Sequence, residues 1–456
     1  MSFFIRKGGG LPLGKKRKAG PEKKVVKKAR KAKEDEEVDS DGSDIEVRDD
    51  AGYESEEDVE TAEEKRLRLA KVYLAEVEEE LKERRGVVEE ADVEERLRED
   101  VAAEKGKLRK VFSTRLAKLT EMGVSYGDKA HKLPITCLCI SPDSKLAFTG
   151  SKDGGLVVWE VATGKKVHRV TGGRRGQESY HPGHCSTVLA VAVSSDGQLL
   201  ASGDVGKNIH VWNIKEGRLE RLHTFRGHRD AVSGLVFRRG THTLYSASWD
   251  RSVKIWSVDE RAYVETLFGH QDKICALDAG SRERCVTAGG RDGSARVWKI
   301  VEESQLVFNG PQTSIDCIAL LNEEHWVTGG EDGHLAVWGI HKKKPLAVLQ
   351  RCHGTDPTNG EPHWVSALAT KNNSDTVVSG SRDGYIRIWA VGEGFRSLKQ
   401  VGQVSLSGFV NCLSISACGG WLVAGVGQEH RLGRWWRDSS VKNRLHTVAI
   451  PDEETE

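Results

Sequence analysis

The sequence predicts an all-β fold, a seven-bladed β-propeller that follows a charged tail and a charged helical segment. The first observation is a repeat: seven short apolar segments end in tryptophan, and successive tryptophans lie 53, 44, 42, 40, 51 and 46 residues apart. About 40 to 45 residues is the length of one four-stranded propeller blade, so the two long intervals indicate insertions. We therefore expect residues 119–450 to form the propeller. The tryptophans are Trp159, Trp212, Trp256, Trp298, Trp338, Trp389 and Trp435.

The second observation is that polar residues recur at fixed distances before these tryptophans. Asp stands six residues before five of them, Ser or Thr ten residues before five, and His 28 residues before four. This pattern resembles the WD40 repeat, in which the His, the hydroxyl and the Asp form a hydrogen-bonded chain that satisfies the buried Trp N–H. The residues we assign to this structural role are His131, Thr149, Asp153 and Trp159, then His228, Ser246, Asp250 and Trp256, then His270, Asp292 and Trp298.

Four blades depart from this spacing, and we expect them to be the looser ones. Blade two has its Asp eight residues before the Trp, blade four has Ala in the hydroxyl position, blade five has Gly-Pro in place of Gly-His, and blade seven lacks both the hydroxyl and the Asp. These departures are Asp204, Ala288, Gly310-Pro311, Gly425 and Glu429.

Blade seven also needs a terminal strand to complete it, because the chain runs out of repeats there. Either residues 445–450 or a strand just before His131 could supply this strand. The C-terminal strand is favoured, but the sequence leaves both open.

A His/Ser/Asp set also suggests a catalytic triad, and its repetition argues against that interpretation. An active site is needed once, whereas a structural hydrogen-bonded chain is needed in each blade. The sequence contains no phosphate-binding glycine loop, no metal-ligand spacing and no paired catalytic carboxylates that stand out. We expect no enzyme, no cofactor, no metal site and no small-molecule substrate.

Charge is strongly segregated within the first 64 residues, although the whole chain has a net charge of only +1. Residues 1–33 carry 13 Lys/Arg and one acid, and residues 34–64 carry 17 acids and one Arg. We expect residues 1–60 and 451–456 to be disordered, since such composition cannot bury enough apolar surface to fold. The two basic clusters in residues 15–33 are typical of a nuclear or nucleolar localisation signal, and could instead contact RNA phosphates.

The cysteine pattern and the hydropathy indicate the cellular compartment of the protein. Nine cysteines without a C-x-x-C pair indicate buried thiols in a reducing compartment. No run of 18 apolar residues occurs, so no membrane span is expected. The N-terminal residues have no hydrophobic core of a secretory signal, which favours an intracellular location.

Residues 61–118 show two apolar stripes at helical spacing on a charged background. One runs from Leu67 to Leu81, and after Gly86 a second runs from Val93 to Phe112. Stripes this narrow do not fold alone, so we expect these helices to dock on a partner or on the propeller. A solvent-exposed single helix is the alternative.

A binding surface is expected on the propeller face that carries the repeat His and Asp, called the top. Both insertions, residues 172–183 and 351–363, belong to this face. The residue before each repeat Asp also points there, which adds Lys152 and Glu331. Basic side chains interleaved with aromatic ones suit phosphates and stacked bases, although ordinary solvated charge is the alternative. The candidate RNA contacts are Arg174, Arg175, Tyr180, Arg229, Trp249, Arg291 and Arg382, with Lys273 beside them.

Longer stretches carry a more specific resemblance. They are GHRDAVSGLVFRRGTHTLYSASWDRSVKIW (227–256), YVETLFGHQDKICALDA (263–279), GGRDGSARVWKIVEESQLVF (289–308), VAGVGQEHRLGRWWR (423–437) and EEKRLRLAKVYLAEV (63–77). They resemble the family of WD-repeat proteins specific to the U3 small nucleolar ribonucleoprotein, and the likeness covers most of residues 60–437. Residues 1–60 match only in character, basic and then acidic.

The resemblance implies a non-catalytic nucleolar protein of the small-subunit processome. Such a protein binds the box B/C region of U3 small nucleolar RNA next to a small kink-turn-binding protein, together with other processome proteins. It acts in the pre-ribosomal RNA cleavages that lead to 18S rRNA and the small ribosomal subunit. The rival interpretation is a peptide-binding scaffold of a chromatin or ubiquitin-ligase complex that uses the same face. The sequence does not decide which top-face residues contact RNA rather than protein.

Overall fold

The computed structural model describes residues 62–85, 90–121, 125–127, 131–174, 176–177, 180–310, 314–357 and 359–451. It contains seven four-stranded antiparallel sheets, so the predicted seven-bladed propeller is confirmed. The predicted tail at residues 1–60, Arg175 and residues 452–456 lie outside the described residues. Within the described helices, none is long and apolar enough to cross a membrane.

The blades follow one another along the chain, and each is numbered in that order. Blade one contains β2 (Ile135–Ile140), β3 (Leu146–Ser151), β4 (Leu156–Glu160) and β5 (Lys166–Val170). Blade two contains β6 (Val188–Val193), β7 (Leu199–Asp204), β8 (Asn208–Lys215) and β9 (Arg218–Arg226). Blade three contains β10 (Val232–Phe237), β11 (Thr243–Ser248), β12 (Ser252–Ser257) and β13 (Ala262–Phe268). Blade four contains β14 (Ile274–Ala279), β15 (Arg284–Gly289), β16 (Ser294–Lys299) and β17 (Ser304–Asn309).

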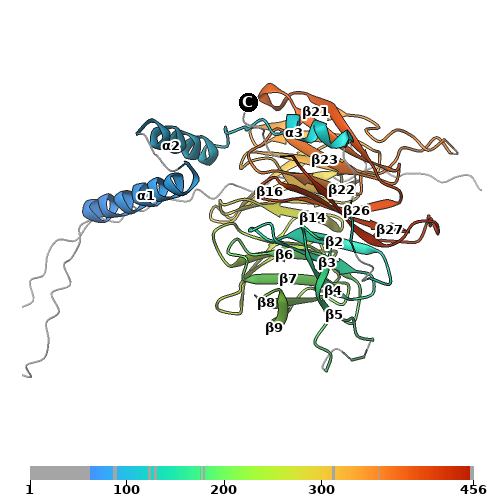
Figure 1. Cartoon of the computed structure of the whole chain (residues 1–456). Coiled ribbons are helices and arrows are strands. Elements are labelled where there is room, and N and C mark those ends of the chain that lie inside the picture. The colour runs from blue at the N-terminus through green and yellow to red at the C-terminus, as the bar shows by residue number, and fades with distance from the viewer. Residues whose placement is uncertain are drawn as a thin grey trace, which may run out of the picture. The chain divides into compact units, whose positions relative to one another are not determined.

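The remaining blades complete the ring. Blade five contains β18 (Ile315–Leu320), β19 (His325–Gly330), β20 (Leu335–Gly339) and β21 (Lys342–Leu349). Blade six contains β22 (Ala367–Thr370), β23 (Thr376–Gly380), β24 (Tyr385–Val391) and β25 (Leu398–Ser405). Each first strand packs against the first strand of the next sheet, and β26 packs against β2. Figure 1 shows blades one and two, β2–β5 and β6–β9, side by side.

Blade seven is completed from both ends of the propeller sequence. Its strands are β26 (Phe409–Ile415), β27 (Trp421–Gly427), β28 (Arg444–Ala449) and β1 (Ser125–Tyr126), in the order β1-β28-β27-β26. Both candidate terminal segments are therefore used: the C-terminal one is the third strand and the one before His131 is the outer strand. Pairing β28 and β1 in one sheet joins distant parts of the chain and closes the ring, and the edges that remain are the short ones of the individual blades.

The assignment of Trp435 to a strand of blade seven was wrong. Trp435 lies in the connection between β27 and β28 and is 61% exposed. In blade three Leu244 pairs with Trp256, and in blade seven the corresponding Leu422 pairs with Val448. Val448 therefore takes the tryptophan position, and Ala424 takes the hydroxyl position because it pairs two residues earlier on β28. Without an indole N–H to satisfy, blade seven needs no hydroxyl there.

Antiparallel order places the strand connections on two faces. Connections from the second to the third strand, and from one blade to the next, lie on the top face. Connections from the first to the second strand, and from the third to the fourth, lie on the opposite, bottom face.

In the described part of the chain before the propeller there are three helices, α1 (Ala62–Arg85), α2 (Glu90–Glu104) and α3 (Ser113–Ala117), followed by a 3-10 turn, η1 (Lys118–Glu121). The expected second stripe does not form one helix up to Phe112, because α2 ends at Glu104. Gly106 then has φ +64°, the left-handed conformation that commonly terminates a helix and that favours glycine. A second short 3-10 turn, η2 (Glu393–Phe395), lies between β24 and β25.

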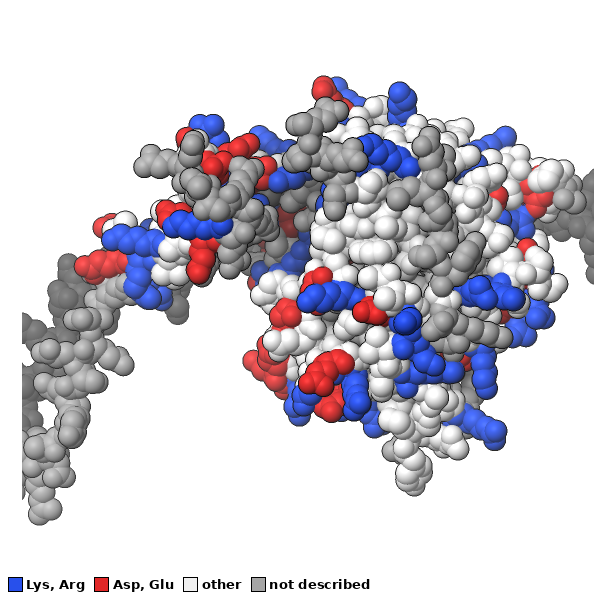
Figure 2. Space-filling view, viewed as in Figure 1, with Lys and Arg blue, Asp and Glu red and all other residues white. Residues whose placement is uncertain are grey.

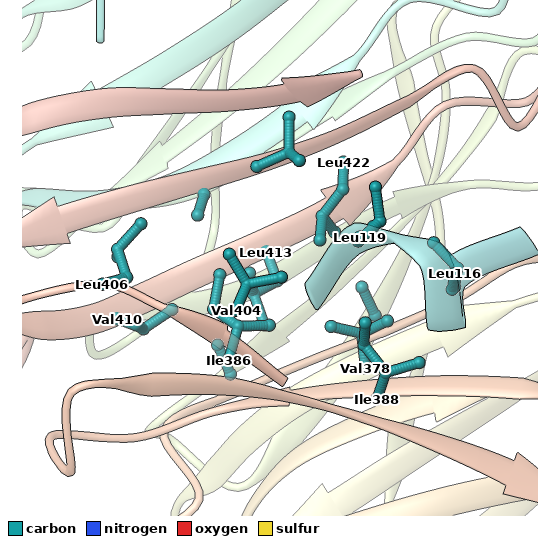
Figure 3. Packing of buried hydrophobic residues seen from close by; sticks show 14 of the residues in the cluster. Leu116, Leu119, Val378, Ile386, Ile388, Val404, Leu406, Val410, Leu413 and Leu422 are labelled. Carbon is teal, nitrogen blue, oxygen red and sulfur yellow. The ribbon is translucent and has the colours of Figure 1, made fainter. Parts of the chain in front are cut away.

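Residues 108–121, here called the strap, pack on blades six and seven. Phe112, Leu116 and Leu119 are buried in one apolar cluster with Val378, Leu422 and other side chains of these blades. Figure 3 shows Leu116 and Leu119 beside Val378, Ile388 and Leu422. The expectation that part of this segment docks on the propeller therefore holds for the strap.

Asp375, at the connection between β22 and β23, holds the start of α3. Its carboxylate accepts hydrogen bonds from the backbone N–H groups of Phe112 (2.8 Å) and Ser113 (3.0 Å) and from the Ser113 hydroxyl (2.7 Å). The first N–H groups of a helix have no partner inside the helix, so a carboxylate from another part of the chain can satisfy them.

Blades two and three are joined on the bottom face by a histidine between two carboxylates. His242 Nδ1 lies 2.6 Å from Asp259 and its Nε2 lies 3.0 Å from Asp196 of blade two. The hydrogen bond to Asp259, with help from Asp196 and against partial burial, raises the pKa of His242 above its usual value of 6.5.

This arrangement predicts a pH dependence of stability. Because the folded-state pKa of His242 is raised, its contribution is fully present below about pH 6.5 and is lost as the pH rises through the folded-state pKa. We expect the urea midpoint of the wild-type chain to fall between about pH 6 and pH 9 by more than that of His242→Gln. Equal falls for the two proteins would contradict the prediction.

Candidate functional site on the top face

Among the described residues, five blades contain the hydrogen-bonded link from the tryptophan to a buried hydroxyl and then to a histidine. In blade three Trp256 Nε1 donates to Ser246 Oγ (2.8 Å), His228 Nε2 lies 2.7 Å from the same oxygen, and His228 Nδ1 lies 3.0 Å from Asp250. Blade one has the same links from Trp159 to Thr149 (2.7 Å) and from Thr149 to His131 (2.8 Å). There, however, His131 Nδ1 is 3.6 Å from Asp153, which is longer than a hydrogen bond.

Blades two and four also contain complete chains, so the expectation that they are looser was wrong. In blade two His184 Nδ1 lies 2.8 Å from Asp204, despite the shifted position of that Asp. In blade four Thr287, not residue 288, supplies the hydroxyl: Trp298 Nε1 donates to Thr287 Oγ1 at 2.9 Å. His270 then lies 2.7 Å from both Thr287 Oγ1 and Asp292 Oδ2.

Blade six contains a histidine that the spacing rule missed. His353 Nε2 lies 2.8 Å from Ser379 Oγ, and its Nδ1 lies 2.9 Å from Asp383. Trp389 Nε1 donates to the same Ser379 hydroxyl at 2.8 Å. His353 stands 36 residues before Trp389 because most of the insertion follows the histidine. A cysteine precedes it and a glycine follows it, so the Gly-His pair of blades two, three and four is absent there.

The charge of the Asp determines which atoms donate and which accept in these hydrogen-bonded chains. Burial raises the pKa of Asp292, but the hydrogen bond from His270 and those from Ser294 outweigh it and lower the pKa to about 2. An ionised carboxylate only accepts, so His270 Nδ1 carries the proton and its Nε2 accepts from the Thr287 hydroxyl. Thr287 in turn accepts from Trp298, and each buried polar group is satisfied. These side chains hold the blade together and are not positioned as a nucleophile and base.

One cluster among the described residues brings three possible metal ligands together: His184, Asp204 and His210. Both ring nitrogens of His184 already face Asp204 and Ser202, and His210 Nδ1 lies 2.9 Å from Thr224. Burial, with a contribution from His184, lowers the pKa of His210 to about 2. A metal ion would have to displace the hydrogen bonds of blade two, so we assign the cluster to that blade's structure.

Some of the candidate RNA-contact side chains are exposed, and others contact partners within the chain. Arg174, Arg229 and Arg291 are exposed on the top face, and Tyr180 in the first insertion is 91% exposed. Trp249 is half-buried, with Lys273 Nζ 4.7 Å from the centre of its ring. Figure 2 shows basic and acidic side chains interspersed over the side of the propeller that faces the viewer.

Two of the top-face cations predicted from the sequence, Arg382 and Lys152, are held by partners within the chain. Arg382 pairs with Asp356, its Nε donates to His363 at 3.3 Å, and its guanidinium lies 4.0 Å from the centre of the Trp436 ring. Lys152 Nζ lies 3.0 Å from the buried carboxylate of Glu429. A phosphate contact by Arg382 would require that Asp356 be displaced.

The prominent feature that sequence reasoning missed is the connection between β27 and β28, residues 428–443, here called the blade-seven loop. It brings His430, Trp435 and Trp436 against Trp364, which directly follows the second insertion. The ring centres of Trp364 and Trp436 are 5.3 Å apart, and those of Trp364 and Trp435 are 5.9 Å apart. Two adjacent tryptophans at 435–436 were the sequence signal for this aromatic loop. Their distance from the preceding repeat, however, predicts that they end a strand.

Beside this aromatic group lies a cavity of about 740 Å³, here called the top cavity. It is bounded by blades three to six and by the blade-seven loop. Its lining combines tryptophans, carboxylates and cations: Trp249, Trp364, Trp435, Trp436, Asp272, Asp316, Glu331, Lys273, Arg291 and Arg431.

Arg431 closes the inner end of the top cavity. Its Nη2 donates to the backbone carbonyl of Asp316 at 2.9 Å. Arg431 also borders a second cavity, which is lined by the first strands around the central channel. The side chain therefore stands between the top cavity and the channel.

The fold and its repeated chains of hydrogen bonds define a WD-repeat β-propeller. Six stretches match the family model described as "WD domain, G-beta repeat": residues 125–160, 176–213, 219–257, 261–299, 302–339 and 351–390. The human protein named U3 small nucleolar RNA-interacting protein 2 is 49% identical over 395 residues, which cover 86% of this chain and 82% of that protein. The chain belongs to the WD-repeat family and, within it, to the family of this human protein.

Two further proteins are similar to the chain. Ribosomal RNA-processing protein 9 of Saccharomyces cerevisiae is 25% identical over 450 residues, which cover 78% of each protein. A solved structure titled "Structure of U3-55K" has a TM-score of 0.69 and 52% identity, and it covers 72% of this chain and 98% of that chain.

Proposed function

We propose that this protein is a non-catalytic component of the U3 small nucleolar ribonucleoprotein that binds U3 RNA through its top face. It would bind the box B/C region beside a small kink-turn-binding protein, and act in the nucleolus in pre-ribosomal RNA processing for 18S rRNA. The single observation that carries the proposal is the 49% identity to a protein named for its interaction with U3 RNA. The name of the yeast relative supports the role in ribosomal RNA processing.

The top face supports an RNA contact in physical terms. Arg229 of blade three and Arg291 of blade four are exposed on neighbouring blades, and Lys273 lies between them in sequence. In the blade-seven loop Arg434 is 68% exposed although its Nε lies 3.2 Å from Glu429. Phosphate contacts by such side chains supply affinity, while exposed aromatic rings such as Trp435 can stack on unpaired bases.

The rival function, a peptide-binding scaffold, is favoured by one observation. Three carboxylates, Asp272, Asp316 and Glu331, line the top cavity together with tryptophans, and this combination also suits a cationic peptide side chain. Salt and nuclease separate the two functions. An RNA complex weakens steeply between low and moderate salt as counterions are released, and nuclease frees the protein from its particle. A peptide complex survives nuclease.

A double charge reversal tests the RNA interface. We expect Arg229→Glu combined with Arg291→Glu to weaken binding of a U3 box B/C RNA by at least about 100-fold and to lower the salt dependence, because two phosphate contacts become repulsive. Affinity is measured by fluorescence anisotropy at several salt concentrations, and folding by circular dichroism.

The matched control reverses two charges near the bottom face. Lys343 and Lys344 are exposed at the start of β21, next to the bottom-face connection from β20, and Lys343→Glu with Lys344→Glu changes the net charge equally. We expect this variant to bind with nearly wild-type affinity. A folded Arg229→Glu, Arg291→Glu protein that retains its affinity would reject the choice of face.

A further inference from the structure

The top cavity is lined by tryptophans, carboxylates and cations, and this combination suits one kind of ligand. We propose that the top cavity admits a single unpaired guanine of the bound RNA, stacked on Trp435 and read by the carboxylate of Asp316. This inference rests on the proposed function and adds to it a base-specific subsite. The volume of about 740 Å³ lies within the usual range of small-ligand sites, roughly 300 to 1,000 Å³.

The tryptophans supply stacking surfaces. Trp435 is 61% exposed, although its ring is held by Trp364 at 5.9 Å and by His430 at 6.0 Å between ring centres. An exposed indole held in place by other rings is available to a base without a large loss of conformational freedom. Base–aromatic stacking contributes to affinity for every base, so the aromatic lining alone gives no preference among them.

The carboxylates supply the preference. Asp316 and Glu331 of blade five line the cavity beside Ser314, whose hydroxyl lies 3.2 Å from Asp316 Oδ1. A carboxylate accepts two parallel hydrogen bonds, and guanine presents two adjacent donors, N1–H and the N2 amino group, on one edge. Uracil, cytosine and adenine each present only one donor group on that edge, so they satisfy one carboxylate oxygen at most.

The carboxylate of Asp316 is buried, and few hydrogen-bond donors surround it. Burial raises the pKa of Asp316, and Arg431 only partly opposes this rise. Arg431 meanwhile donates to the backbone carbonyl of Asp316, which fixes the position of the residue. Incoming N–H donors would therefore compensate a carboxylate that has few donors around it.

The cations favour a nucleotide over a peptide cation. Lys273, Arg291 and Arg431 line the same cavity and balance the charge of its three carboxylates, so a lone lysine or arginine side chain meets no net negative charge there, while the cations can attract the phosphates that flank a base. Arg431 also closes the way to the central channel, so the occupant is limited to the top face.

The test uses the full chain and a U3 box B/C RNA in which the unpaired guanines are replaced one at a time by inosine, which lacks the N2 amino group. We expect one replacement to weaken binding to the wild-type protein roughly ten-fold, as for loss of one specific base contact. The same replacement should have no effect on Asp316→Asn, because that variant has lost the paired acceptors. Trp435→Ala should weaken binding roughly ten-fold, and Trp435→Phe much less.

The controls separate this inference from the proposed function. Tyr263→Ala removes another half-exposed aromatic ring, on the outer strand of blade three, and should leave affinity unchanged. If the wild-type protein binds the RNA but Asp316→Asn and Trp435→Ala leave affinity and inosine sensitivity unchanged, the guanine subsite is wrong and the proposed function stands. If the wild-type protein binds no U3 RNA, both fail. Quenching of tryptophan fluorescence by arginine amide, but not by GMP, would assign the cavity to a peptide cation instead.

Discussion

Replacing Thr287 by valine is expected to lower the free energy of unfolding by about 3 kcal/mol, although valine has nearly the same shape. The threonine hydroxyl accepts from Trp298 Nε1 (2.9 Å) and donates to His270 Nε2 (2.7 Å), and all three side chains are buried. The variant leaves an indole N–H and an imidazole nitrogen in the core without partners. Each buried unsatisfied group costs about 1 to 3 kcal/mol, and no cavity is created that could admit water.

The measurement is urea unfolding followed by tryptophan fluorescence and circular dichroism. Thr287→Ser is the matched control, since it retains the hydroxyl and should cost about 1 kcal/mol through the lost methyl group. Adding Ala288→Ser to the Thr287→Val variant tests the register. Adjacent residues of a strand face opposite sides, so a hydroxyl at 288 cannot reach Trp298 and should restore no stability. Recovery of stability in the double variant would contradict the register of blade four.

Blade four shows why the sequence predicted the fold better than it predicted individual contacts. The number of blades depends on a repeat that tolerates variable turns. The hydroxyl position depends on register, and Thr287 pairs with Arg296 on β16 as Ser246 pairs with Lys254 on β12. The turn of blade four contains one more residue, so counting back ten residues from Trp298 reaches Ala288 and not the residue that faces the indole.

Counting residues back from the tryptophan also gave wrong assignments in blades six and seven, for a related reason. In blade six the insertion separates His353 from the strand that follows it, so its distance from Trp389 no longer identifies it. In blade seven the Trp-containing segment resembles the end of a strand but lies in a loop, while Val448 on β28 occupies the position of the tryptophan. Pairing between strands, which a single sequence does not reveal, decides both cases.

The candidate RNA-binding site could be predicted only in part, because the repeat positions some of its residues and irregular segments position the others. The sequence places Arg229 and Arg291 on the top face by periodicity alone, and both are exposed there. It could not predict that Arg382 forms an ion pair with Asp356, because Asp356 lies in an insertion whose conformation no repeat specifies. The blade-seven loop and the top cavity depend on the same kind of irregular segments, so they became visible only in three dimensions.

Replacing Asp375 by alanine is expected to release the strap and to lower the free energy of unfolding by about 3 kcal/mol. The carboxylate, which is 3% exposed, accepts from two backbone N–H groups and one hydroxyl of the strap, and Arg109 lies 3.8 Å away. Alanine leaves both N–H groups without an acceptor. Asp375→Asn is the control, because its amide oxygen can still accept from them and should retain about half of the stability, as a neutral hydrogen bond is roughly half as strong.

Hydrogen exchange at Phe112 and Ser113 distinguishes local release from global unfolding. We expect Asp375→Ala to accelerate exchange in the strap while the central strands of blades one to five retain their protection. The strap packs on β24 and β25 of blade six and on bottom-face connections, including Lys371, whose Nζ lies 4.1 Å from the centre of the Phe112 ring. Affinity for U3 RNA should therefore stay unchanged, since the proposed contacts lie on the opposite face. A large loss of RNA affinity in this variant, with the blades still protected, would show that the strap or the helices before it contribute to the interface.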